Sequence, residues 1–180
     1  MIDEYVAGFL FAQDTKGRPV VTLIQKTKPE WQAGKWNGVG GKVEPNEYPH
    51  DAMAREFAEE TGLAIEEWEK FAGLAGHKWR VTFYRAFESQ EVQNDVQTME
   101  EEEVKNWSVD MLPDVIPNLR WLIPLALDTN TKYYPINIGV VEPGTQLLRP
   151  VLRGGGEVDV ADAQSASEYR IETDELSVTD

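Results

Sequence analysis

Three glutamates behind one arginine are the residues of this sequence best suited to chemistry. Arg55 precedes Glu56, Glu59 and Glu60. If the segment is helical, residues three and four positions apart share one face, so these carboxylates crowd together. Like charges in that arrangement repel one another, and a hard divalent cation, which prefers oxygen ligands, would stabilise them. The spacing therefore predicts a metal site on one helix.

Turn and capping residues predict the elements that hold these glutamates. Pro49 suits the first turn of a helix and Gly62 suits a C-terminal cap, so we expect a helix between them. Before it, residues 37–41 are too rich in glycine for a helix and suit close backbone approach. An apolar arc beside the glutamates would pack on a sheet. Its members are Met53, Ala54, Phe57 and Ala58.

Apolar, β-prone runs predict several strands. Those at 5–11 and 20–24 flank turn residues and read as a hairpin, and others lie at 70–75 and 79–87. Strands at both ends with helices between them predict an α/β sandwich, a mixed sheet held between helices. The remaining expected elements are a loop at 90–103, a strand at 104–109, a helix at 117–127 that Pro124 should disturb, and a final hairpin of 133–141 and 147–152.

Composition sets limits on partners and location. The 180 residues carry a formal net charge of −15, which argues against binding to polymeric nucleic acid or to an anionic membrane. There is no cysteine, so thiolate ligands and disulfides are excluded. The acidic start is unlike a secretory signal and no apolar run has transmembrane length, so we expect a cytoplasmic protein. We expect one domain at 1–153 and a disordered acidic tail at 154–180.

Nine residues fit a single pattern, G-x5-E-x7-R-E-U-x-E-E-x-G-U, in which U is apolar. They are Gly41, Glu47, Arg55, Glu56, Phe57, Glu59, Glu60, Gly62 and Leu63. Nine constrained positions at fixed spacing are a specific signal. The sequence thereby resembles the Nudix hydrolase family. A Trp-Asn-Gly-x-Gly-Gly-Lys-Val loop and the stretch 121–125 are similar to its MutT-like branch, whose members hydrolyse oxidised purine nucleoside triphosphates; the resemblance covers about 5–153.

The resemblance implies a Nudix-type α/β/α sandwich and a pyrophosphohydrolase that uses Mg²⁺ or Mn²⁺ and an attacking water. By motif position, the metal ligands are Glu56, Glu59 and Glu60, joined by the carbonyl of Gly40 or Gly41. Glu59, Glu60 and Arg55 would also act in catalysis, with Glu47 as the structural partner of Arg55 and with Gly41 and Gly62 as structural glycines. A further ligand or base often comes from a later loop, and Glu102 (ligand) and Glu103 (base) are the candidates.

Substrate contacts are expected outside this motif. Asn37 matches the asparagine that contacts the purine in MutT-like triphosphatases, although it would also suit a turn. Asn118 lies where that branch places a base-reading Asn or Asp, although it would also suit a helix N-cap. Trp36 and Trp31 flank the loop and could stack on a base. Lys42 and Lys26 are candidates for phosphate contact.

The leading hypothesis is hydrolysis of a nucleoside triphosphate, such as the oxidised purine nucleotide 8-oxo-dGTP, to the monophosphate and pyrophosphate. The partner would be this small-molecule nucleotide, and the protein would be a monomer or homodimer. One alternative is the same chemistry on ADP-ribose or a dinucleotide. Another is a nucleotide-binding domain without catalysis, but such members usually lack some of the motif glutamates and this sequence has all of them.

Overall fold

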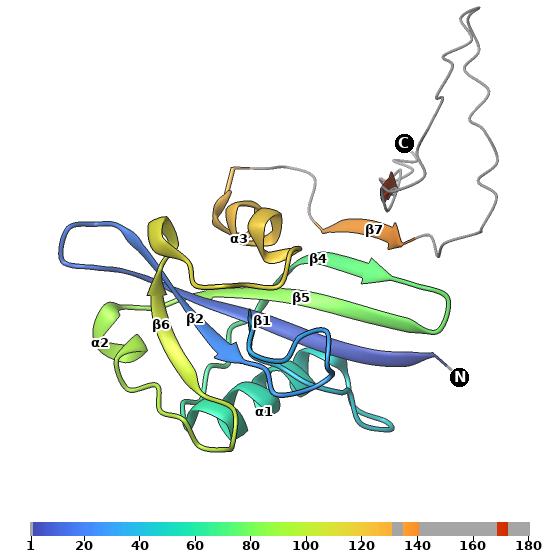
Figure 1. Ribbon diagram of the computed structural model, residues 1–180, viewed down its shortest axis with the longest axis horizontal. Helices are drawn as coiled ribbons and strands as arrows, with labels where there is room; N and C mark the ends of the chain where they lie inside the picture. Colours follow the sequence, from blue (N-terminus) through green and yellow to red (C-terminus); the bar gives the residue numbers. More distant parts are fainter. Residues whose placement is uncertain (1, 131–134, 141–168, 173–180) are drawn as a thin grey trace, which may run out of the picture.

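A mixed sheet with helices on both faces carries the fold (Figure 1). The computed structural model describes residues 2–130 and 135–140 and the backbone of 169–172. In these residues the sheet has eight strands, ordered β3-β2-β1-β5-β4-β7-β8, and β6 also pairs with β2. The pairs β1/β5 and β4/β7 are parallel and the others antiparallel, which confirms the predicted mixed sheet. The strands are β1 (Asp3–Gln13), β2 (Pro19–Gln25), β3 (Trp36–Asn37), β4 (Glu69–Ala75), β5 (Trp79–Phe87), β6 (Val104–Ser108), β7 (Ile136–Val140) and β8 (Tyr169–Glu172).

Helix α1 follows its expected capping residues closely, whereas α3 departs from the expected helix at its start. Helix α1 (Pro49–Thr61) has proline in its first turn and ends at Gly62, whose φ of 70° is left-handed and whose N–H donates to the Ala58 carbonyl at 2.9 Å. Helix α3 (Leu119–Leu127) begins two residues later than expected. It also continues past Pro124, so the predicted disturbance does not end it.

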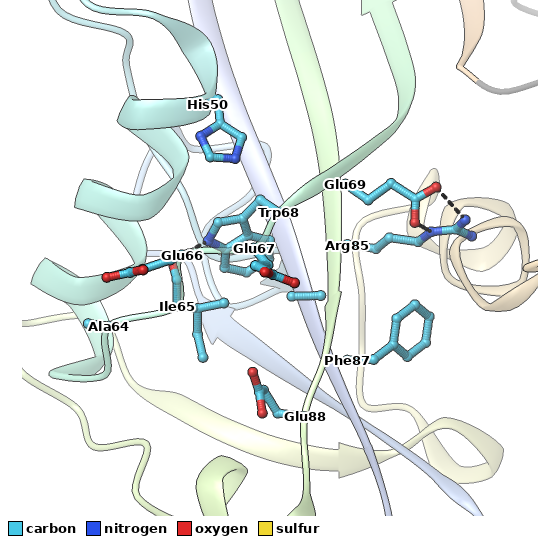
Figure 2. Close-up of a pocket in the computed structure, with 11 residues that line it drawn as sticks. His50, Ala64, Ile65, Glu66, Glu67, Trp68, Glu69, Arg85, Phe87 and Glu88 are labelled. Carbon is cyan, nitrogen blue, oxygen red and sulfur yellow. Dashed lines mark hydrogen bonds and ion pairs between the residues drawn. The ribbon is translucent and has the colours of Figure 1, made fainter.

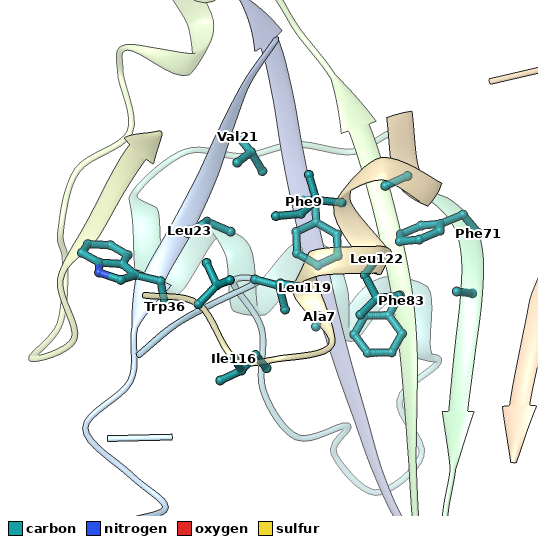
Figure 3. Packing of buried hydrophobic residues seen from close by; sticks show 14 of the residues in the cluster. Ala7, Phe9, Val21, Leu23, Trp36, Phe71, Phe83, Ile116, Leu119 and Leu122 are labelled. Atoms are coloured by element: carbon teal, nitrogen blue, oxygen red, sulfur yellow. The ribbon is translucent and has the colours of Figure 1, made fainter. Parts of the chain in front are cut away.

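Each face of the sheet carries its own core. Successive side chains of a strand point to opposite faces, and in β1 Phe9 packs under α3 whereas Leu10 packs under α1. Figure 3 shows the first core, where Leu119 and Leu122 of α3 lie beside the aromatic rings of the sheet. On the other face, Phe57 of α1 meets the indole of Trp68 edge to face, with ring centroids 5.0 Å apart. The layers are therefore α/β/α, as predicted.

The glycine-rich segment before α1 lies along β1. The N–H of Gly8 donates to the Val39 carbonyl at 2.7 Å, and the N–H of Val6 donates to the Gly41 carbonyl at 2.9 Å. This pairing occupies the first half of β1, because β2 pairs with the second half. The segment is thus fixed to the sheet by backbone hydrogen bonds before the chain enters α1.

Part of the expected loop at 90–103 is helical. Helix α2 (Gln90–Gln93) is capped by Ser89, whose hydroxyl accepts a hydrogen bond from the Val92 N–H. Gln93 is fully buried, and its side-chain amide nitrogen donates to the Leu10 carbonyl at 3.0 Å. Within a segment expected to be loop, this glutamine thus satisfies backbone acceptors in the core.

The C-terminal expectations are met only in part. Strand β7 lies within the expected strand 133–141, whereas the expected strand 147–152 lies outside the described residues. Residues 169–172, placed by expectation in a disordered tail, form β8 instead, because the edge of β7 offers unpaired backbone groups. The rest of 154–180 is not described, and the boundary at 153 stays a prediction. Within the described chain, every helix is too short or too polar to cross a bilayer.

Gly40 should be required for the segment that precedes α1. Its φ is 154°, and a Cβ there would lie 2.2 Å from the Val6 carbonyl oxygen, which β1 holds in place. We expect Gly40→Ala to lower the free energy of unfolding by more than about 1 kcal/mol, measured by urea denaturation. Gly17→Ala is the matched control, because Gly17 also has positive φ but has open space around it. Equal losses in both variants would contradict the steric explanation.

Candidate active site

The guanidinium of Arg55 organises the acidic side chains of the predicted site. It binds Glu47 at two points, Nε to Oε1 at 2.8 Å and Nη2 to Oε2 at 2.9 Å. Its Nη1 donates to Glu56 at 2.9 Å and to Glu59 at 3.0 Å. Nη2 also donates to the Lys42 carbonyl at 3.2 Å. One cation therefore joins the loop before α1 to two carboxylates on the helix, which are the contacts expected of Arg55 and Glu47.

The pKa values around Arg55 reflect this network. The hydrogen bond to Glu47 is the largest influence that raises the pKa of the Arg55 guanidinium, and the same bond lowers the pKa of the Glu47 carboxyl. Burial raises the pKa of Glu56, and the hydrogen bond from Arg55 opposes it. Glu47 and Arg55 are therefore charged at neutral pH, and they fix the loop and the helix to each other.

Gly41 leaves space for the Glu56 carboxylate. A Cβ on Gly41 would lie 2.2 Å from Glu56 Oε2, so any side chain at this position would push the carboxylate away. The Gly41 carbonyl accepts the Val6 N–H, whereas no described residue donates to the Gly40 carbonyl. Of the two carbonyls considered as ligands, that of Gly40 is thus the one without a hydrogen bond in the described part of the chain.

Glu60 differs from the other two glutamates of α1. Burial raises the pKa of its carboxyl to about 7, the nearby charge of Lys26 lowers it, and the charges of Glu100, Glu102 and Glu56 raise it further. Its Oε2 atom is buried and has no hydrogen-bond partner among the described residues. Glu59 is mostly exposed, with 53% of its side chain accessible. Glu60 is therefore the glutamate best suited to exchange a proton near neutral pH.

The later acidic loop contributes Glu102 but not Glu103. Glu102 is buried, and its Oε1 accepts the Thr27 N–H at 2.5 Å and the Thr27 hydroxyl at 2.9 Å, while its Oε2 binds the Lys26 ammonium. Burial acts to raise the pKa of Glu102, but the hydrogen bonds from Lys26 and Thr27 lower it overall. Glu103 pairs with Lys105 at 2.7 Å, and no described contact joins its carboxylate to the glutamates of α1. The structure therefore does not bring the candidate base Glu103 into the site.

Two of the expected substrate residues are engaged elsewhere. Trp36 is 6% exposed and packs edge to face on Trp107, with ring centroids 5.1 Å apart, so it belongs to the core and not to a stacking surface. The pairing of β3 with β2 turns it inward. Lys42 pairs with Asp3 at 2.6 Å. Trp31, in contrast, is 64% exposed and leaves an aromatic face available on the loop.

The two asparagines are placed differently. The Asn37 side chain donates to Gln32 Oε1 at 3.0 Å and accepts the Gly38 N–H at 2.7 Å, so it also fixes the loop. Asn118 stands at the N-cap position of α3, but its side chain makes no capping hydrogen bond. Its Oδ1 is buried and has no partner among the described residues. Helix capping therefore does not explain the presence of an asparagine side chain at position 118.

An open pocket beside α1 lies apart from these residues. Figure 2 shows an open pocket of about 750 Å³ whose lining includes His50, Trp68 and Phe87. Arg85 and Glu69 pair at its rim at 2.9 Å. None of the glutamates that contact Arg55 lines it, so the chemistry predicted from the sequence belongs to another part of the surface.

Comparison with known proteins settles the family. A family model described as NUDIX domain matches residues 4–125, which is more than half of the chain. The chain belongs to the NUDIX family. It is 39% identical over 57 residues to the oxidized purine nucleoside triphosphate hydrolase of Danio rerio, over 32% of this chain and 36% of that protein. It is 43% identical over 47 residues to the putative 8-oxo-dGTP diphosphatase 2 of Mycobacterium tuberculosis, over 26% of this chain and 33% of that protein.

Each of these matches spans only about a third of the relative. Among solved structures, the NUDIX protein resembles the mMutator MutT protein of Bacillus halodurans, with a TM-score of 0.60, 18% identity and coverage of 95% of this chain and 98% of the other. It also resembles the NUDIX domain of Shewanella oneidensis NrtR complexed with ADP ribose, with a TM-score of 0.58, 21% identity and coverage of 70% and 86%. These structures confirm the fold, and the comparisons together confirm the predicted MutT-like Nudix assignment.

NUDIX hydrolases generally use divalent metal ions, so the glutamates of this NUDIX protein can be tested for fit. Within the described chain, no three acidic or histidine side chains converge closely enough to hold a metal ion as they stand. Arg55 instead occupies one oxygen each of Glu56 and Glu59. The donors are nevertheless hard oxygens, and the buried Glu60 Oε2 has no hydrogen bond to give up. The donor atoms of these residues therefore suit a hard divalent cation.

Burial of the Glu60 carboxylate should cost this NUDIX protein stability at high pH. The folded-state pKa of about 7 lies above the ordinary glutamate value of 4.5, so the stabilisation that Glu60 contributes is fully present below pH 4.5 and is lost as pH rises through 7. We expect the free energy of unfolding of Glu60→Gln, taken relative to wild type, to be about 1 kcal/mol higher at pH 8.5 than at pH 5, with both measured in EDTA. This value allows for partial solvent screening of the Glu60 charge. Urea denaturation at both pH values measures this gain. The exposed Glu67→Gln is the control, and a pH-independent difference for Glu60→Gln would refute the assignment.

Proposed function

We propose that this chain is a Mg²⁺- or Mn²⁺-dependent hydrolase that cleaves a nucleoside triphosphate to the monophosphate and pyrophosphate in the cytoplasm. An oxidised purine nucleotide such as 8-oxo-dGTP is the proposed substrate. The observation that carries the reaction class is the Arg55 network, in which the motif residues Glu47, Glu56 and Glu59 meet one cation inside a NUDIX fold. The intact glutamate set supports an enzyme over a binding domain without catalysis.

The residues of the chain have separable tasks in this proposal. Glu56, Glu59 and Glu60, with the Gly40 carbonyl, would hold the cation, and Glu102 is a further candidate ligand. When bound, a divalent cation neutralises charge on the phosphate oxygens and lowers the pKa of an attacking water. Glu60 would accept the proton of that water, because its buried oxygen Oε2 has no hydrogen-bond partner among the described residues. Arg55 keeps Glu56 and Glu59 on the same side of α1.

Asn118 carries the proposal for the substrate. Its Oδ1 is buried without a partner among the described residues, and such an atom is costly unless a ligand supplies a donor. A purine base carries N–H groups that can donate to it. Asn37 sits on the loop before α1, and the exposed indole of Trp31 on the same loop offers a face for stacking. The named activities of the Danio rerio and Mycobacterium tuberculosis relatives agree with this choice.

ADP-ribose is the alternative substrate, because one solved structure with a similar fold contains ADP ribose. The same carboxylates could act on the diphosphate of that compound. A panel of nucleoside triphosphates, ADP-ribose and dinucleotides, incubated with Mg²⁺ and analysed by mass spectrometry, separates the two. Cleavage of ADP-ribose with no cleavage of any triphosphate would overturn the first choice.

The same panel tests the glutamates. We expect Glu56→Gln and Glu59→Gln each to lower kcat/KM by more than about 100-fold, since each would remove a charged oxygen ligand. Glu67→Gln, which changes an exposed glutamate away from Arg55, should leave kcat/KM unchanged. Full pyrophosphate release by both motif variants would show that the assigned roles are wrong.

Asn118→Ala should affect substrate choice without affecting stability. We expect kcat/KM for the oxidised purine nucleotide to fall about 10–100-fold, while a pyrimidine triphosphate loses much less. Because Asn118 makes no capping hydrogen bond, the free energy of unfolding should change by less than about 0.5 kcal/mol, below the ~1 kcal/mol typical of a lost cap. The exposed Asn130→Ala is the control. Destabilisation with unchanged base selectivity would identify Asn118 as a structural residue only.

A further inference from the structure

Lys26 is a cation placed inside the acidic site. Its ammonium binds Glu102 Oε2, and only 19% of the Lys26 side chain and 10% of the Glu102 side chain are accessible. Its charge also acts on Glu60, as does that of Glu102. The Glu60 oxygen Oε2 is buried and has no described partner. Lys26 is therefore a positive charge close to carboxylates that are candidates for a metal.

The two oxygens of Glu102 are held differently. Thr27 binds Oε1 through both its N–H, at 2.5 Å, and its hydroxyl, at 2.9 Å. Oε2 contacts only the Lys26 ammonium among the described residues. The carboxylate thus has one oxygen anchored to the backbone and one whose partner is a flexible side chain.

The backbone around this contact is fixed on both sides. Lys26 exchanges backbone hydrogen bonds with the loop, donating to the Lys35 carbonyl at 2.9 Å and accepting from the Gly34 N–H at 2.8 Å. The Gln25 N–H donates to the Glu103 carbonyl at 2.8 Å, which ties the acidic loop to β2. Glu102 Oε2 can therefore change partner by rotation of the Lys26 side chain alone, with no movement of either loop.

We propose that Lys26 is an exchangeable counter-ion that sets the affinity of the site for a divalent cation by occupying Glu102. This rests on the proposed function in so far as the cation binds at the glutamates of α1. A lysine ammonium is a compact charge on a flexible stem, so it can leave one oxygen without breaking a two-point contact. Without metal it neutralises Glu102 and partly screens Glu60. Binding of the cation displaces it, and the cost of displacement lowers metal affinity.

The test measures Mn²⁺ binding by the electron paramagnetic resonance of free Mn²⁺, with the full chain and no nucleotide. We expect Lys26→Met to bind Mn²⁺ on the order of tenfold more tightly, because the positive charge that pairs with Glu102 is removed. Lys28→Met removes the same charge from an exposed position on the same loop and should change affinity by less than about twofold. Lys26→Arg should stay close to wild type.

A double variant isolates the role of Glu102. If Lys26 acts by occupying Glu102, the gain from Lys26→Met should shrink to less than about threefold in a Glu102→Gln background. An equal gain in Mn²⁺ affinity in both backgrounds would show that Lys26 acts through its charge without occupying Glu102. That result would overturn the proposed exchange. Unchanged or weaker binding by Lys26→Met, or no Mn²⁺ binding by any variant at millimolar concentration, would overturn it as well. Circular dichroism checks folding, and Lys26→Gln, which can still hydrogen-bond Glu102, replaces Lys26→Met if that variant unfolds.

Different results would contradict the exchange of Lys26 and the proposed hydrolase activity. If Lys26→Met tightens Mn²⁺ binding but the protein cleaves no nucleotide, the hydrolase proposal is wrong and the exchange stands. If wild type cleaves nucleotides and Lys26→Met leaves Mn²⁺ affinity unchanged, the exchange is wrong and the hydrolase proposal stands.

Discussion

The bridge that Arg55 makes between a loop and a helix is the interaction on which the candidate site depends. The guanidinium binds Glu47 and the Lys42 carbonyl on one side and Glu56 and Glu59 on the other. Without it, neighbouring carboxylates on α1 would repel one another. The bridge reaches both sides only because backbone hydrogen bonds hold the segment before α1 along β1. The sheet therefore positions the loop, and one cation then positions the acids.

The two adjacent glycines before α1 are needed for different physical reasons. Gly40 has a φ of 154°, and a side chain there would collide with the carbonyl of Val6 in β1. Gly41 needs no unusual φ; a side chain there would fill the space of the Glu56 carboxylate. The first residue fixes how closely the loop approaches the sheet, and the second leaves room for a functional group. Substitutions at these adjacent positions therefore act on different properties, stability in one case and the placement of a carboxylate in the other.

Local spacing allowed the core of the site to be predicted, while long-range packing decided the rest. Helical spacing and two capping residues are enough to place Glu56, Glu59 and Glu60 behind Arg55. The position of Trp36 beside a glycine loop predicts a stacking residue, but its indole packs on Trp107, which is distant in sequence. The choice between Glu102 and Glu103 likewise depended on Thr27 and Lys105, whose positions no local pattern reveals. Residues in contact only through the tertiary fold were thus the ones that the sequence left open.

The different chemistry of arginine and lysine would allow such an acidic site to be stable and still accept the proposed cation. Arg55 is planar and permanently charged and holds Glu47 at two points, so it suits a lasting structural bond. Lys26 makes a single contact with Glu102 through a flexible stem. In a chain with a net charge of −15, carboxylates without any counter-ion would favour unfolding or protonation. In the proposed exchange, Arg55 preserves the geometry of the acids, while Lys26 gives up its place to the divalent cation.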